Sequence, residues 1–105
     1  MLVVNRFTVA EEAAFVERAH AAIGALSERP GFQRASLGRS ADDPSWWCLV
    51  TEWESVGSYR RALSAYQVKL EATPLLAEAI EEPSAYEVLA ASDGAGIVTA
   101  PSDRA

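Results

Sequence analysis

Three side chains of this sequence have the chemistry to hold a substrate oxygen, or bound dioxygen, in apolar surroundings. Asn5 interrupts an apolar N-terminal run, and its amide both donates and accepts hydrogen bonds. Trp53 and Tyr59 each combine a flat apolar ring with one polar group. A structural alternative stays open for each, with Asn5 bonding a neighbouring loop and the two aromatic residues packing in a core. We take these three as the candidate catalytic residues.

The segment WWCLVTEW, residues 46–53, contains all three tryptophans of the chain. Successive side chains of a strand point to opposite faces, so Trp46 and Trp47 serve different surfaces. We expect Trp46 to face a partner subunit. Trp53 ends the strand where the chain turns into a helix, and it is the better candidate to touch a ligand.

Composition excludes several classes of function. The net charge of −6, without a basic stripe, argues against nucleic-acid binding. Cys48 is the only cysteine and His20 the only histidine, so no internal disulfide and no usual set of metal ligands is available. A Gly-rich phosphate loop and a nucleotide fingerprint are also absent from the sequence. We therefore expect no metal, flavin or nicotinamide cofactor.

Other reactive residue types have ordinary structural explanations. His20 falls on the flank of a helix stripe, where a histidine is usually solvated. Cys48 lies within an apolar strand and is expected to pack as a small hydrophobe, because no base or cationic group stands near it in sequence. Asp42 and Asp43 belong to a turn-rich loop. We assign none of them a catalytic role.

The ends and the hydropathy of the chain suggest no membrane association. The N-terminus MLVVNRFTV lacks the features of a signal peptide, and no apolar stretch approaches the roughly 20 residues that span a bilayer. We expect a cytoplasmic protein.

The pattern of apolar residues predicts one domain built from short strands and amphipathic helices. A capping box at Thr8 and Glu11 is expected to start the first helix, which Pro30-Gly31 ends. Ser55 is expected to cap the second helix. Thr73 is expected to cap a short third helix with Pro74 at its first position. The expected strands are residues 2–8, 32–38, 46–53 and 84–91, and the expected helices lie between residues 8 and 30, from 55 to about 70, and over 75–82.

This order of elements predicts an α+β fold of the ferredoxin-like type. Strand, helix, strand, strand, helix, strand is the split βαβ pattern (β-α-β-β-α-β), an antiparallel sheet with helices on one face. The domain is expected to cover residues 1–91, and residues 92–105 to form a flexible C-terminal tail.

The strand and helix periodicities also define the residues that would line a substrate site. Trp53 shares one strand face with Leu49 and Thr51, and Asn5 shares one with Phe7. The second helix is expected to present one apolar stripe. That stripe comprises Val56, Tyr59, Leu63, Tyr66 and Leu70. The expected substrate-binding residues are Phe7, Leu49, Thr51, Leu63 and Tyr66.

Both faces of the predicted sheet are apolar. The runs MLVV and WWCLV place apolar side chains on both parities of their strands, whereas a half-exposed sheet alternates apolar and polar residues. The helices cover one face, and leaving the other in water would expose a large apolar patch. We therefore expect a homodimer in which two sheets pack face to face.

Several segments resemble one known family. The strand VVNRFTV, the PGF after the first helix and the VTEWES segment before a tyrosine-bearing helix are similar, over about residues 1–91, to the antibiotic biosynthesis monooxygenase (ABM) family. The resemblance implies a dimeric α+β barrel formed by two ferredoxin-like subunits. It also implies one of two activities. Some members oxidise polyketide-type anthrones and related phenols to quinones without metal or flavin, and others bind and degrade haem.

The resemblance assigns roles residue by residue. Trp53 matches the tryptophan of the family's W-E-S segment, Tyr59 the tyrosine of the polyketide oxygenases, and Asn5 the first-strand asparagine of the haem degraders. The asparagine and arginine partners of the anthrone oxygenases are replaced, at about Leu49 and Thr73. A second set of departures concerns haem: the helical tryptophan of the haem degraders falls on about Ala62, and their haem-ligating histidine, expected near Ala72, is absent.

The expected function is a cofactor-independent monooxygenase that oxidises an aromatic, polyketide-like or quinol substrate with O2. An electron-rich substrate that has lost a proton can itself pass an electron to dioxygen, and Asn5, Tyr59 and the indole N–H of Trp53 could stabilise the developing oxyanion or peroxide. No histidine or carboxylate is clearly placed as a general base. The alternatives are a non-catalytic dimeric protein that binds a small aromatic or hydrophobic ligand, and a haem-binding relative, which the missing histidine and tryptophan disfavour.

Overall fold

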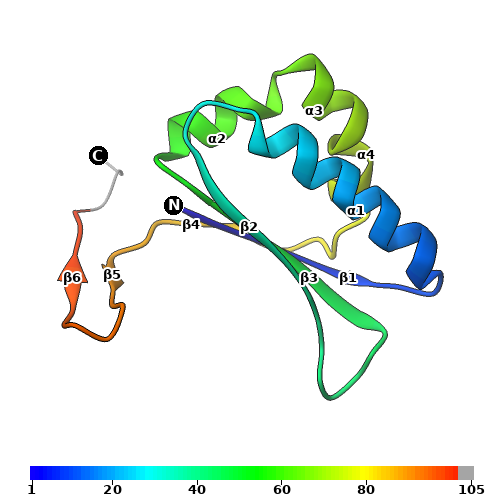
Figure 1. The fold of residues 1–105 in the computed structure, drawn as a ribbon, viewed down its shortest axis with the longest axis horizontal. Coiled ribbons are helices and arrows are strands. Elements are labelled where there is room, and N and C mark those ends of the chain that lie inside the picture. The colour runs from blue at the N-terminus through cyan, green and yellow to red at the C-terminus, as the bar shows by residue number, and fades with distance from the viewer. Residues whose placement is uncertain (102–105) are drawn as a thin grey trace.

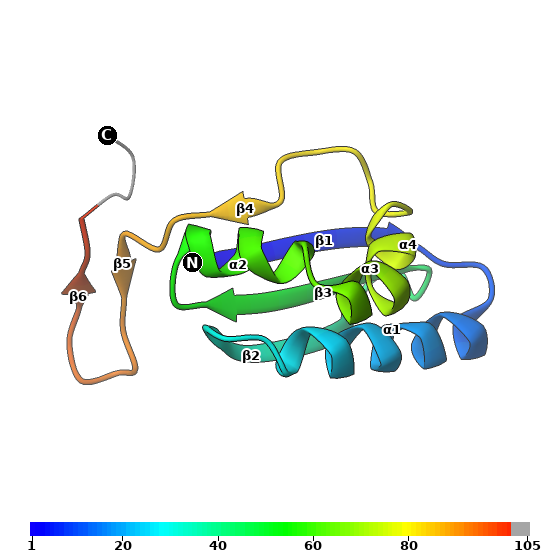
Figure 2. The same cartoon turned by 90° about the horizontal axis from the view of Figure 1, so that it is seen from above.

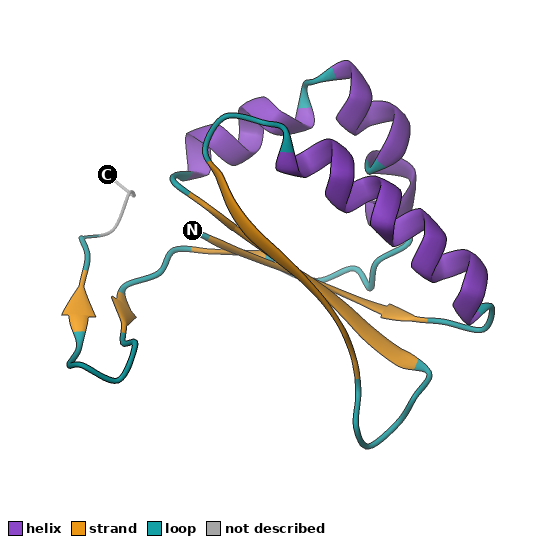
Figure 3. Cartoon of the chain, viewed as in Figure 1, coloured by secondary structure: helices purple, strands orange, loops and turns teal. Residues whose placement is uncertain are grey.

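The computed structural model describes residues 1–101, and it places a layer of helices on one face of an antiparallel sheet (Figures 1 and 3). Figure 1 shows the helices α1 to α4 together on the same side of the sheet. The elements, in chain order, are β1 (Leu2–Thr8), α1 (Glu12–Ser27), β2 (Phe32–Arg39), β3 (Trp46–Trp53), α2 (Val56–Leu63), α3 (Tyr66–Glu71), α4 (Thr73–Leu76), β4 (Ala85–Tyr86), β5 (Ala90–Ala91) and β6 (Val98–Thr99). The predicted α+β, ferredoxin-like fold is confirmed.

The sheet has the strand order β2-β3-β1-β4, with antiparallel pairing throughout. Figure 2 shows β1 and β3 running side by side, with α1 beside β2. In the central pair Val3 lies opposite Thr51, Asn5 opposite Leu49, and Phe7 opposite Trp47. Because the side-chain period of a strand is two residues, these pairs share one face.

The face that carries these pairs forms the core beneath the helices. Every second residue of β3, from Trp47 through Leu49 and Thr51 to Trp53, is buried, as the strand pattern predicts. The helices contribute mostly small or aliphatic side chains to this core. These are Ala19, Ala22, Ala25 and Leu26 of α1, and Ala62, Val68, Ala72 and Leu75 of the later helices and the turn between α3 and α4.

The expected capping box at the start of the first helix is wrong. Thr8 is the last residue of β1 and pairs with Trp46. Helix α1 begins four residues later at Glu12, and no side chain caps its first turn. The sheet pairing thus takes Thr8 away from the capping position. The cap predicted at Ser55 is confirmed, because the Ser55 hydroxyl accepts a hydrogen bond from the Ser58 backbone N–H at 3.1 Å.

The second helix is not continuous, so its predicted apolar stripe is wrong beyond Leu63. The chain turns at Ser64 and α3 starts afresh at Tyr66, which shifts the phase of all later residues. Tyr66 is 74% exposed and Leu70 is 53% exposed. Val68 occupies the buried position instead.

The predicted third helix corresponds to α4 and is shorter than expected. It spans only Thr73–Leu76, with Pro74 in its first turn, and Ala72 rather than Thr73 is its cap residue. After α4 the chain returns to the sheet, where the Ile80 backbone N–H donates a hydrogen bond to the Arg6 carbonyl of β1 at 2.8 Å. The expectation of a helix over 75–82 is therefore wrong.

The last predicted strand, 84–91, is divided into two. Its first part, β4, pairs with Leu2 and Val3 of β1, whereas β5 pairs with β6 in a separate two-stranded sheet. Part of the expected flexible tail, 92–105, thus belongs to this hairpin, and its last residues, 102–105, lie outside the described part of the chain. Within residues 1–101, no helix is long and apolar enough to cross a membrane.

Gly31 allows β2 to start close against α2. Its φ of +88° lies in the left-handed region, and a Cβ there would stand 2.4 Å from the Cβ of Ser58. The Gly31 carbonyl also accepts a hydrogen bond from the Glu54 backbone at 2.8 Å. Gly31 thus holds the end of β3 and the start of α2 together, where Trp53 and Tyr59 lie.

We predict that Gly31→Ala lowers the free energy of unfolding by at least about 2 kcal/mol, because it adds backbone strain to a clash with Ser58. Chemical denaturation monitored by tryptophan fluorescence measures the change. The matched control is Gly24→Ala in α1, where a Cβ would meet nothing within 4 Å. That variant should gain up to about 1 kcal/mol, since alanine favours a helix over glycine. Equal effects of the two substitutions would contradict this role of Gly31.

Candidate functional site

Asn5 carries an unpaired amide on the helix-covered face of the sheet. It lies in the middle of β1, opposite Leu49, and is half-buried. Among the described residues its side chain has no hydrogen-bond partner, so the structural alternative of a bond to a neighbouring loop finds no support. An unmade hydrogen bond of a shielded amide costs about 1–3 kcal/mol. The amide is thus free to bind an oxygen of a ligand.

Trp53 is fully buried in the core, and its indole N–H already makes a hydrogen bond. Its side chain is 0% exposed, and its indole Nε1–H donates a hydrogen bond to Thr51 Oγ1 at 2.8 Å. The ring packs edge-on against Phe32, with centroids 5.3 Å apart, and against Tyr59 at 5.5 Å. The expectation that this N–H is available to stabilise an oxyanion is therefore wrong for this structure. Its contribution is shape and rigidity.

Tyr59 keeps a free phenol beside Trp53. The capping box of Ser55 and Ser58 fixes the first turn of α2, and Tyr59 follows directly. The side chain is half-buried, and among the described residues its hydroxyl has no hydrogen-bond partner. Burial raises the pKa of the Tyr59 phenol above its usual value. The phenol therefore stays protonated at neutral pH and can donate a hydrogen bond.

The predicted substrate-binding residues fall into three groups. Phe7, Leu49 and Thr51 are buried on the sheet face around Asn5, and Leu63 is half-buried on α2. Tyr66 points to solvent, so the prediction that it shares this face is wrong, and the break between α2 and α3 is the reason. The structure thus gathers the strand residues on one surface and separates Tyr66 from it.

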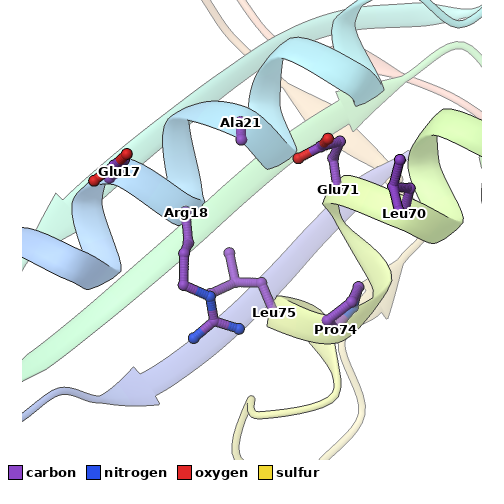
Figure 4. Close-up of a pocket in the computed structure, with 7 residues that line it drawn as sticks. All are labelled: Glu17, Arg18, Ala21, Leu70, Glu71, Pro74 and Leu75. Atoms are coloured by element: carbon purple, nitrogen blue, oxygen red, sulfur yellow. The ribbon is translucent and has the colours of Figure 1, made fainter.

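Two surface hollows flank Arg18 on the helix side of the molecule. One, of about 290 Å³, lies between α1 and the α3–α4 region, and Figure 4 shows the side chain of Arg18 extending from α1 toward Leu75. The other, of about 300 Å³, is lined by Phe7 and Phe15 among others, and Arg18 borders it too. Asn5, Trp53 and Tyr59 line neither hollow. These hollows approach the core from outside but stop short of the candidate residues.

An ion pair between Arg18 and Glu78 borders the second of these hollows. The two terminal guanidinium nitrogens of Arg18, Nη1 and Nη2, donate to the Glu78 carboxylate. This bonding raises the pKa of Arg18 and lowers the pKa of Glu78. Both side chains are largely exposed, so the pair adds little stability. Sequence reasoning missed it, because the two residues are 60 positions apart and no local pattern connects them.

The residues that haem would need are absent. Ala62 and Ala72, at the positions where haem degraders carry tryptophan and histidine, are fully buried in the helix layer. The single histidine, His20, is exposed on α1. Within residues 1–101 no group of three or more histidine, cysteine or acidic residues is placed to hold a metal ion. The donor set does not fit haem.

Cys48 and the acidic turn are remote from this site. Cys48 is half-buried on the opposite face of the sheet, next to Gly38. Asp43 accepts hydrogen bonds from the backbone and hydroxyl of Ser45, which lowers the pKa of its carboxyl. These contacts stabilise the turn before β3, as the sequence suggested.

Comparison with known proteins identifies the family. The family model described as antibiotic biosynthesis monooxygenase matches residues 1–70. The fold is similar to that of SnoaB, a cofactor-independent oxygenase from Streptomyces nogalater, at 29% identity and a TM-score of 0.68, over 84% of this chain and 94% of SnoaB. A mutant of SnoaB matches at 30% identity and a TM-score of 0.67, over 75% of this chain and 82% of that one.

A conserved protein from Methanosarcina mazei Go1 is similar in fold alone, at 20% identity and a TM-score of 0.65, over 80% of this chain and 84% of that protein. No curated protein matches the chain. The chain belongs to the antibiotic biosynthesis monooxygenase family.

We predict that Tyr59 makes the protein sensitive to high pH. Because the folded-state pKa is raised, the stability that the neutral phenol contributes is fully present below about pH 10 and is lost as the pH rises through the folded-state value. Tyr59→Phe should therefore flatten the decline of the unfolding free energy above pH 10. Denaturant titrations over that range measure it. Tyr66→Phe, which removes an exposed phenol, should leave the decline unchanged, and equal behaviour of the two variants would contradict the assignment.

We also predict that haemin finds no specific site. Titration of the protein with haemin should give no saturable shift of the Soret band, because no buried imidazole is available as a ligand. A shift that disappears in His20→Ala would mark binding to the exposed histidine only. A sharp, saturable shift that persists in His20→Ala would show that haem does bind.

Proposed function

We propose that the protein is a cofactor-independent monooxygenase that uses O2 to oxidise an aromatic, polyketide-like or quinol substrate. The observation that carries the proposal is two free polar groups on the helix-covered side, the Asn5 amide opposite Leu49 and the Tyr59 phenol against the rigid Trp53. The similarity to SnoaB, a cofactor-independent oxygenase, supports the same class of reaction.

The substrate itself supplies the electrons in this reaction. Loss of a proton turns an anthrone or hydroquinone into an electron-rich anion, which passes an electron to O2. The resulting radical pair combines to a peroxide. In an anthrone, loss of water from this peroxide leaves one oxygen atom as the new carbonyl and releases the other as water, so the four-electron oxidation of the CH2 group balances the reduction of O2. The protein needs to hold the ring, exclude water and stabilise the developing negative charge.

Asn5 and Tyr59 are the residues suited to this stabilisation. Asn5 faces Leu49 across the strands, and by the family resemblance Leu49 stands where the anthrone oxygenases carry an asparagine. Asn5 would thus supply an amide to the same region from the neighbouring strand. Tyr59, kept neutral by its surroundings, would donate a second hydrogen bond.

The proposed working unit is a homodimer. The face of the sheet opposite the helices carries half-buried apolar residues of both central strands, among them Val4 and Val50. In a single copy this face meets water, and packing two such faces together would bury them.

A non-catalytic dimer that binds a small hydrophobic ligand is the second candidate. Among the described residues, the buried polar side chains are Thr51 and Ser58, and neither is a base at neutral pH. The lack of a buried general base favours this ligand-binding candidate. Under the enzymatic proposal the substrate must be acidic enough to lose its proton to water.

We predict that Asn5→Ala and Tyr59→Phe each lower the rate of quinone formation about 100-fold, the usual loss when one oxyanion donor is removed. The assay incubates the purified protein with a panel of anthrones and hydroquinones under oxygen and compares each rate with buffer alone. Melting temperatures should change little, because neither polar group bonds another described residue.

Gln33→Ala and Tyr66→Phe are the matched controls, since both side chains are exposed, and their rates should equal that of the unmodified protein. A rate no faster than in buffer across the whole panel would remove the enzymatic proposal and leave the ligand-binding one. Parallel losses of rate and melting temperature in the Asn5 and Tyr59 variants would assign these residues to packing.

A further inference from the structure

Thr51 carries a hydroxyl proton that no described residue accepts. Two polar side chains are buried among the described residues, Ser58 and Thr51. The Ser58 hydroxyl is satisfied, because it donates to the Ser55 carbonyl at 2.8 Å and accepts from the Ser55 backbone N–H at 3.1 Å. Thr51, which is 3% exposed, accepts the Trp53 indole N–H at 2.8 Å but donates to no described group. A hydroxyl has one donor besides its acceptor lone pairs, so one buried donor is left over.

The bond from Trp53 determines what the Thr51 hydroxyl can still do. The Trp53 ring is fully buried and packs against Phe32 and Tyr59, at centroid distances of 5.3 and 5.5 Å. Its N–H therefore occupies one lone pair of the Thr51 oxygen in a fixed geometry. A hydroxyl that already accepts a hydrogen bond is a stronger donor, because consecutive bonds polarise one another. The Trp53 N–H thus prepares Thr51 to donate.

The register of the central strands places this hydroxyl near the Asn5 amide. Thr51 lies opposite Val3, and Leu49 lies opposite Asn5. Asn5 and Thr51 are therefore diagonal neighbours on the helix-covered face. Diagonal neighbours of an antiparallel pair are about 7–8 Å apart, which lets two side chains reach one atom between them. No hydrogen bond joins the two side chains, so both donors are free for the same ligand.

The donors on this face are neutral. Among the described residues, the buried ones include no lysine or arginine, and the neighbours Val3 and Leu49 are apolar. In such surroundings a hydrogen bond to a developing negative charge is worth more than in water. Donors that bind an ionised oxygen better than its neutral form lower the pKa of the group that bears it. A site of this kind makes its ligand more acidic without a buried base.

We propose that Thr51 donates a hydrogen bond to the substrate oxygen that becomes negative when the substrate loses its proton. The inference rests on the proposed function and deepens it. The proton goes to water, and the electron pair that it leaves is delocalised onto the oxygen held by Thr51 and Asn5. Thr51 is thus a catalytic residue, and Trp53 is a positioning residue that acts through it. Their combined effect compensates for the missing general base.

The test measures the acidity of a bound phenol, which needs no turnover. The probe is para-nitrophenol, whose phenolate absorbs visible light, titrated with the purified protein over a range of pH. The bound probe should ionise at a lower pH than the free probe. In Thr51→Val, which removes the donor, the ratio of bound phenolate to phenol at a given pH should fall about tenfold. Thr51→Ser keeps a hydroxyl, and its ratio should stay within about threefold of that of the unmodified protein.

The role of Trp53 is tested through the coupling of two substitutions. Trp53→Phe removes the indole N–H and should lower the phenolate ratio less than Thr51→Val does. Adding Trp53→Phe to Thr51→Val should change the ratio little further, because Trp53 acts through Thr51. Both substitutions alter the core, so circular dichroism first establishes a temperature at which every variant is folded. Losses that multiply in the double variant would assign Trp53 to packing alone.

The outcomes separate this inference from the proposed function. An equal phenolate ratio in Thr51→Val and the unmodified protein, or equal losses in Thr51→Val and Thr51→Ser, would overturn the role of Thr51. So would a protein that forms quinone but binds no probe, and the monooxygenase proposal would then stand. A protein that shifts the probe through Thr51 but forms no quinone would keep the donor and remove the monooxygenase.

Discussion

The antiparallel register of β1 and β3 is the constraint on which the rest of the structure depends. It places Phe7 opposite Trp47 on one face and Val4 opposite Val50 on the other. A shift by one residue would exchange the two faces of β1 and bring Arg6 beneath the helices. The register therefore decides which side chains form the core beneath the helices and which ones lie on the opposite face of the sheet.

On the inner face, packing determines which polar groups remain free. Trp53 satisfies its indole through Thr51, at 2.8 Å, and is held between Phe32 and Tyr59. This leaves Asn5 and Tyr59 as the polar groups without a partner among the described residues of that face. Free hydrogen-bonding groups on a rigid, largely apolar face are what a cofactor-independent oxygenation would require of a protein.

The outer face of the sheet carries half-buried apolar residues of both central strands, among them Val4 and Val50. In the proposed homodimer a second copy covers this face, whose charges are already paired, Arg6 with Glu82 and Arg34 with Glu52. The two faces are linked through the strands that they share. A change in β1 or β3 therefore affects the core and the proposed dimer together, and site variants in these strands have to be interpreted with both in view.

The sequence by itself determined the sheet and the identity of its inner residues. Strand alternation over 46–53 fixed the buried set from Trp47 to Trp53, and the Ser55 cap followed from local chemistry. It could not give the break after Leu63, the loss of the Thr8 cap or the division of the last strand. The last two depend on pairing between residues far apart in the chain, Thr8 with Trp46 and Tyr86 with Leu2, and local periodicity cannot predict such pairing. Whether a given polar group was free or satisfied was likewise decided only when the chain had folded.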